Sequence, residues 1–122
     1  MIESGMPALL ASVAPAHPTF KPDDTGYPVI SYILFSRVES ESHDGPSGLV
    51  EYHYQFTMHA QTSAACRQMR EDVIAKLRTV HDAYVGGVNI TMVRITASRH
   101  IGHFPDWDAW QESVDAIFHV KE

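Results

Sequence analysis

The amino-acid sequence predicts an α+β fold, with a four-stranded, mostly antiparallel sheet, one long helix packed on it and a short N-terminal helix, in the order α-β-β-α-β-β. Three observations predict this fold. Residues 49–59 alternate apolar and polar side chains, as a half-buried strand does. Residues 62–84 carry one apolar stripe at helical spacing. The length of 122 residues suits one domain, so we expect a single domain over 1–122.

The N-terminal segment is expected to form a short helix and then an irregular stretch. Apolar residues at positions 2, 6, 9, 10 and 13 share one helical face, although Gly5 and Pro7 weaken a helix. Prolines at positions 15, 18, 22 and 28 favour an extended or turning chain, because each proline restricts itself and its predecessor. The helix should therefore depend on docking against the rest of the chain.

The first two strands are expected to form a hairpin. Val29–Val38 is β-branched and aromatic with apolar side chains on both faces, which is typical of a strand central in a sandwich or buried by a partner chain. Leu49–His59 alternates cleanly and predicts a half-buried strand. Between them, Glu39–Gly48 is a polar segment rich in turn-forming residues and is expected to be a loop.

The long helix is expected to begin at Thr62 or Ser63 and to run to about Tyr84, with Gly86-Gly87 supplying its left-handed cap and the next turn. Its stripe consists of Cys66, Met69, Val73, Leu77, Val80 and Tyr84. The third and fourth strands are expected at Val88–Ser98 and Ser113–Val120. A long loop that contains both tryptophans should connect them.

Composition and charge disfavour several classes of function. Nine Lys and Arg against fifteen Asp and Glu give a net charge of −6, which disfavours phosphate binding and therefore nucleic-acid recognition. Cys66 is the only cysteine, so the chain has no disulfide pair and no cysteine-based zinc site. We expect no membrane span, because no run of 18 apolar residues occurs, and no signal peptide, because the N-terminal segment lacks Lys and Arg.

No pattern of catalytic or metal-binding residues emerges. His100, His103, Asp106 and Asp108 match no closed metal motif, so we expect no metal and no cofactor. Cys66 lies on the apolar stripe and is interpreted as a core residue rather than a nucleophile. The acidic residues near position 41 are interpreted as solvated charges, because nothing apolar nearby would raise a carboxyl pKa. We therefore expect a protein that is not an enzyme.

The apolar excess outside any catalytic pattern indicates binding to other proteins. The first strand is apolar on both faces, and the long loop carries Phe104, Trp107 and Trp110. Aromatic residues are favoured at interfaces, and a long ordered loop in a small domain usually binds something. We expect Trp107 and Trp110 to contact a partner rather than fill the core of their own chain.

The order of several short motifs resembles the tail-completion, or tail-terminator, proteins of long-tailed bacteriophages and of related gene transfer agents. The resemblance extends from about Ala14 to Val120. Its motifs are His17-Pro18-Thr19-Phe20, Tyr27-Pro28-Val29-Ile30-Ser31-Tyr32, Asp44-Gly45-Pro46-Ser47-Gly48-Leu49, Ala60 and Thr62 followed by the Arg67–Leu77 helix, and Gly86-Gly87. The segment Trp107–Trp110 departs from the pattern of the family.

The resemblance implies a non-enzymatic virion protein, made in the cytoplasm of a host bacterium. Such proteins form a ring, commonly a hexamer, that ends the head-proximal side of the tail tube. The implied partners are further copies of the chain, the tail tube protein and the head–tail connector or stopper protein, with DNA passing through the lumen without specific binding. For the oligomer, tail or head interface we expect Tyr32, Glu39, Glu41, His43, Asp44, His53, His59, Phe104, Trp107 and Trp110.

Two other readings stay open at this point. One is a head-completion or connector protein of the same particle. The other is a small α+β ligand-binding or enzymatic domain, such as a dimeric ferredoxin-like barrel with a pocket between sheet and helices, which would need convergent polar groups in that pocket.

Overall fold

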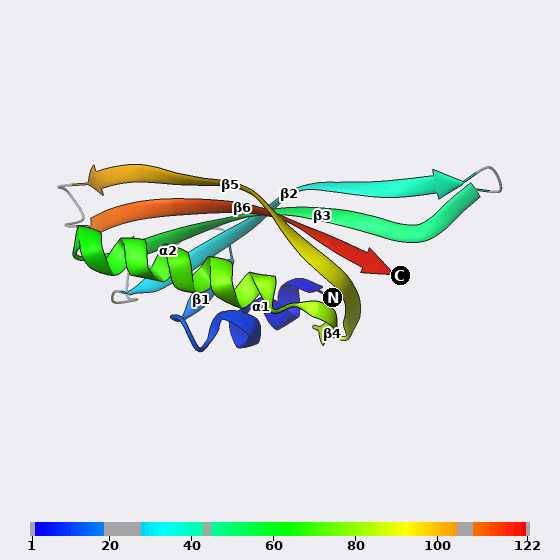
Figure 1. Cartoon of the computed structure of the whole chain (residues 1–122), viewed down its shortest axis with the longest axis horizontal. Helices are drawn as coiled ribbons and strands as arrows, with labels where there is room; N and C mark the ends of the chain where they lie inside the picture. The colour runs from blue at the N-terminus through cyan, green and yellow to red at the C-terminus, as the bar shows by residue number, and fades with distance from the viewer. Residues whose placement is uncertain (1, 19–27, 43–44, 105–108, 122) are drawn as a thin grey trace.

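The computed structural model describes residues 2–18, 28–42, 45–104 and 109–121 of the chain (Figure 1). These residues form a mostly β structure. Its elements are α1 (Ile2–Leu10), β1 (Ala16–Pro18), β2 (Val29–Ser42), β3 (Gly45–Ala60), α2 (Ser63–Arg78), β4 (His81–Val85), β5 (Val88–Phe104) and β6 (Ala109–Lys121). The predicted α+β fold, with four strands in the order α-β-β-α-β-β, is therefore wrong.

The strands form one six-stranded sheet in the order β1-β2-β3-β6-β5-β4. β1 pairs with β2 in parallel, and every other neighbouring pair is antiparallel. The sheet is twisted, and both helices lie on one side of it (Figure 1). The β2–β3 hairpin and the connected ends of β5 and β6 project toward opposite ends of the molecule (Figure 1).

The long helix was predicted too long at its C-terminal end. It begins as expected, because the Thr62 side chain accepts a hydrogen bond from the backbone N–H of Ala65 at 3.1 Å. It ends at Arg78, where the Thr79 backbone N–H bonds the last carbonyls, and residues 81–85 form β4 instead. Apolar residues at positions 80 and 84 fit the helical stripe and an edge strand equally well. Residues 81–85 form a strand because they pair with β5.

Gly86 and Gly87 form the turn of a hairpin rather than a helix cap. Both have positive φ, and Val85 pairs with Val88 across them, as in a two-residue hairpin turn. Gly5 of α1 lies so close to this turn that a Cβ at position 5 would overlap the backbone nitrogen of Gly86. The glycine that weakens α1 as a helix therefore allows it to dock.

Both predicted long loops are largely strand. β2 continues to Ser42 and β3 starts at Gly45, while β5 continues to Phe104 and β6 starts at Ala109. The polar residues in these segments predict loops only when the sequence of each segment is considered without the strand beside it. Antiparallel pairing with a neighbour supplies backbone hydrogen bonds that do not depend on side-chain polarity.

The core lies between the sheet and the helices. Phe118 of β6 is fully buried, with its ring centroid 5.5 Å from that of Tyr54 and 6.1 Å from that of Phe56. α2 packs on this aromatic cluster through the buried residues Cys66, Met69, Val73, Ile74 and Leu77. Four of these five belong to the stripe expected from the sequence, so the helix phase is confirmed where the helix exists.

Candidate assembly surface

One face of the sheet carries neither helix (Figure 1). Successive side chains of a strand point to opposite faces, and buried Phe56 lies in the core on the helix side. Thr57 therefore belongs to the uncovered face, and the register places Ser31 of β2 and Ser113 of β6 beside it. Arg99 of β5 continues this row, because it pairs with Ser113.

Polar side chains of the uncovered face bond to one another. His59 Nε2 lies 3.0 Å from Ser31 Oγ, and Gln55 Nε2 donates to Ser113 Oγ at 3.3 Å. Arg99 forms an ion pair with Asp115 at 2.8 Å. Groups bonded in this way order the middle of the face.

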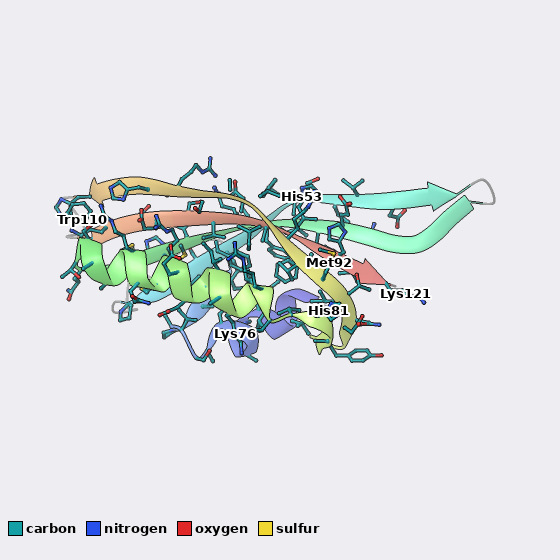
Figure 2. The ribbon with its side chains drawn as sticks, in the orientation of Figure 1. His53, Lys76, His81, Met92, Trp110 and Lys121 are labelled. Carbon is teal, nitrogen blue, oxygen red and sulfur yellow. The ribbon has the colours of Figure 1, made fainter. Side chains whose placement is uncertain are left out.

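Glu51 lies between two half-buried histidines on the same face. Its carboxylate oxygens are 3.4 Å from His53 Nε2 and 3.7 Å from His119 Nδ1. Figure 2 shows His53 on the side of the sheet away from α2. Among the described residues, no three His, Cys, Asp or Glu side chains are arranged to hold a metal ion.

The edge of β2 carries an apolar rim on the uncovered face. Ile33, Phe35 and Val38 are 42%, 58% and 46% exposed. A register shift between Leu34 and Ser36 leaves Phe35 without a direct partner in β3, and its ring meets that of His53 edge-on at 5.9 Å. Three large apolar side chains that stay exposed along one strand form a candidate surface for protein contact. We call Ile33, Phe35 and Val38 the β2 rim.

A buried carboxylate lies on the helix side of the sheet. Glu112 of β6 is 1% exposed, and its two oxygens lie 3.1 Å from Arg70 Nη1 and 2.6 Å from His100 Nδ1. Arg70 belongs to α2 and His100 to β5, so Glu112 joins the helix to two strands. A buried charge is tolerated when it is paired and hydrogen-bonded in this way.

Cys66 lies close to this carboxylate and is a core residue, as the sequence predicts. It is 1% exposed, and its Sγ lies 3.4 Å from the carbonyl oxygen of Met58 and 3.3 Å from that of Trp110. Burial, together with the negative charge of Glu112, raises the pKa of the Cys66 thiol from 9.0 to about 11. The thiol therefore stays protonated at neutral pH, whereas a nucleophilic cysteine needs a lowered pKa.

Changing Cys66 to serine should lower the free energy of unfolding by ~1–3 kcal/mol, because it places a hydroxyl in an apolar site. Cys66→Ala is the control for the loss of the sulfur alone. The native thiol should also resist labelling. Between pH 9 and about 11 the unfolded thiol ionises while the folded thiol keeps its proton, so wild-type stability should fall there and that of Cys66→Ala should fall less. Rapid labelling of the native protein at pH 8 would contradict the burial.

The structure separates the residues expected at an interface. Tyr32 is buried in the core and His59 is buried on the uncovered face. Glu39 is exposed and pairs with Arg37 at 3.0 Å, and His53 is half-buried beside Glu51. Of Glu41 and Phe104, only the backbone in β2 and β5 belongs to the described part of the chain, and His43, Asp44 and Trp107 lie outside the described residues.

Trp110 is half-buried and packs against the core of its own chain. Its ring centroid lies 4.9 Å from that of His103 and 6.0 Å from that of His100. Figure 2 shows it at the opposite end of β6 from Lys121. His100 and His103, which were considered as metal ligands, thus contact the Trp110 indole on the helix side of the sheet.

Sequence reasoning indicated the doubly apolar first strand as a binding surface, but it did not name Ile33, Phe35 and Val38 among the interface residues. The signal was present, because Val29–Val38 is apolar on both faces and burial by a partner chain was one of two readings of that pattern. One apolar face of β2 lies in the core. On the other face Val29 is buried, whereas Ile33, Phe35 and Val38 are exposed. Which residues these are depends on the register with β3, which the sequence of one strand does not contain.

Neither helix has the length and apolar character to span a bilayer, within the residues that the structure describes. No model of a known protein family matches the sequence, and no curated protein matches it. Among solved structures, the fold is similar to a chain of a structure described as "Virion of native gene transfer agent (GTA) particle", with a TM-score of 0.72 and 10% sequence identity. The likeness covers 99% of this chain and 92% of that chain, so the two share a fold over nearly their whole length.

Proposed function

We propose that this chain is a structural virion protein that forms a ring, commonly a hexamer, at the head-proximal end of a tail tube. The ring ends tube polymerisation and joins the tail to the head connector. The observation that carries the proposal is the likeness in fold, over 99% of the chain, to a chain of a gene transfer agent virion. The motifs that resemble tail-terminator proteins extend over the same part of the chain.

The shape of the sheet supports a role in assembly. A ring of identical copies needs two different surfaces on each copy that fit one another. The sheet is open, with β1 at one side and β4 at the other, and the β2 rim leaves apolar side chains exposed near one of these sides. The described residues thus offer unlike surfaces at the two sides of one sheet.

The charge of the chain supports passage of DNA without binding. The net charge of −6 repels phosphate, and attraction in a lumen would slow transit. Arg99 on the uncovered face is already paired with Asp115 at 2.8 Å. The remaining partners of the ring are the tail tube protein on one side and the connector or stopper protein on the other.

Two measurements test the ring and its role. Native mass spectrometry of the purified chain should show, as concentration rises, a closed species near six times 13.6 kDa. Particles produced without this chain should have tails of irregular length and few heads joined to tails. Tails of normal length that fail to join heads would instead indicate a head-completion protein. Normal joined particles would rule out both roles.

A further inference from the structure

We propose that the outer edge of β2 in one copy pairs with the outer edge of β5 in the next copy, so that one antiparallel sheet continues around the ring. This inference rests on the proposed ring and names the contact that closes it. Its partner is a second copy of this chain.

Both edges lack a partner strand over a long stretch of the described structure. β1 pairs only with residues 30–32 of β2, so the outer edge from Ile33 to Ser42 meets no described strand. β4 reaches only Met92 of β5, so the edge from Val93 to Phe104 is equally open among the described residues. At ~3.3 Å per residue the open edge of β2 is roughly 30 Å long and that of β5 roughly 36 Å. Open edges of this length are templates for pairing with another chain.

The strand directions suit a head-to-tail contact. Three antiparallel pairings separate β2 from β5 through β3 and β6, so β2 and β5 run in opposite directions within one copy. When a neighbour is related by rotation about an axis along the strands, its β5 therefore runs antiparallel to β2. Contacts between two different surfaces generate rings when the rotation closes.

The side chains of the two edges complement one another on the uncovered face. β2 offers the rim of Ile33, Phe35 and Val38, while β5 offers Arg94 and Arg99 on the same face, since they pair with Ile117 and Ser113. Arginine covers apolar surface with its stem and is attracted to aromatic rings. Arg94 is exposed and forms no hydrogen bond or ion pair within the described structure, whereas Arg99 already holds Asp115.

The bulges on the two edges preserve the alignment of side chains on the uncovered face across the contact. When Val38 is level with Arg94, the residue skipped in β2, Phe35, comes near the residue skipped in β5, Thr96. One extra residue on each side preserves the alternation of faces beyond the bulges, so Ile33 comes level with Arg99. In the same register Glu39, in the acidic part of β2, lies near Arg94 at one end of the contact.

Disulfide trapping tests this contact with the full chain. Within one copy, positions 38 and 94 lie on opposite outer strands with β3 and β6 between them, roughly 14 Å apart at ~4.8 Å per strand, which is too far for a disulfide. Across an antiparallel contact the two Cα atoms would be ~4.5–5.5 Å apart, which a disulfide spans. Both side chains are exposed, and buried Cys66 does not compete for oxidation.

The variant carrying Val38→Cys and Arg94→Cys should, on mild oxidation, give a non-reducing gel ladder that ends at the ring size. The chain with Val38→Cys alone can give at most dimers. Val38→Cys with Ala75→Cys is the matched control, because position 75 is exposed on α2 and lies off both edges. Val38→Cys with Ala97→Cys samples the next position on the same face of β5 and allows for a shifted register.

Three outcomes separate this contact from the ring itself. A ladder in either edge variant, absent from the α2 control, supports the pairing. Rings seen by native mass spectrometry without a ladder in either edge variant would overturn the edge pairing and leave the ring standing. A wild-type chain that stays monomeric at every concentration would overturn both.

Discussion

Phe118→Ala should lower the free energy of unfolding by ~3–5 kcal/mol, the range for removing a large aromatic side chain from a core. Phe118 is fully buried and contacts the rings of Tyr54 and Phe56 at the centre of the sheet. Surrounding strands cannot collapse into the space, because they are tied to their neighbours by antiparallel pairing on both sides of β6. Typical domains have only ~5–15 kcal/mol of stability, so this loss is a large fraction of the total.

Urea unfolding followed by circular dichroism measures this effect, at protein concentrations low enough to keep the chain monomeric. Phe118→Leu is the conservative control and should cost less than ~1.5 kcal/mol. Phe35→Ala is the second control, because Phe35 is 58% exposed and should leave monomer stability within ~0.5 kcal/mol. Equal losses for Phe118→Ala and Phe35→Ala would contradict the assignment of Phe118 to the core and Phe35 to the open face.

Arg70→Ala should lower the free energy of unfolding by ~2–4 kcal/mol, because it removes the arginine from the buried Glu112 carboxylate and leaves only the contact with the His100 ring. His100 is about half exposed and replaces only part of the lost interaction. Arg70 itself is 24% exposed, which places the expected effect below that of a fully buried pair. Stability is lost because a buried charge is left uncompensated, and not because packing contacts between α2 and the sheet are lost.

Arg67→Ala provides a matched control for this effect, since Arg67 is exposed on the same helix one turn earlier and should change stability by less than ~0.5 kcal/mol. The double variant Arg70→Met with Glu112→Leu removes both charges and should recover most of the loss, because apolar side chains of similar size can replace a buried pair. Identical urea midpoints for Arg70→Ala and Arg67→Ala would mean that Glu112 does not depend on Arg70.

Segments with strong local patterns were predicted correctly. Thr62 caps a helix because its side chain bonds a backbone N–H three residues later, an interaction within one turn of chain. The alternation of 49–59 predicted a strand with buried Tyr54 and Phe56, because period-two patterning needs only one sheet face in contact with a core. The burial of Cys66 followed in the same way from its place on the helix stripe.

Segments with weak or ambiguous patterns were not predicted correctly. Positions 80–84 fit a helix stripe and an edge strand, and the segments expected as loops around 40–48 and 99–111 contain polar residues, glycine and proline that a paired strand tolerates. Gly102, with φ of 133°, lies next to a register shift between His100 and Gly102, which shows how β5 accommodates a residue expected in a loop. The interface residues were predicted least well. Tyr32 and His53 belong to the same predicted strand pair, but the register places them on opposite faces of the sheet.

Local sequence patterns were enough to predict the helical phase of 63–78, the alternation of 49–59, the buried thiol and the apolar excess of 29–38, because each depends on residues near one another in the chain. The acidic charge follows from composition alone. The tertiary structure alone decided that β4 forms, that β5 and β6 extend through polar segments, and that Ile33, Phe35 and Val38 lie on an open edge. These features depend on which strand lies beside which, as in the order β1-β2-β3-β6-β5-β4. Backbone hydrogen bonds between distant segments are nearly independent of side-chain identity, so strand order and register are set by how the whole chain packs.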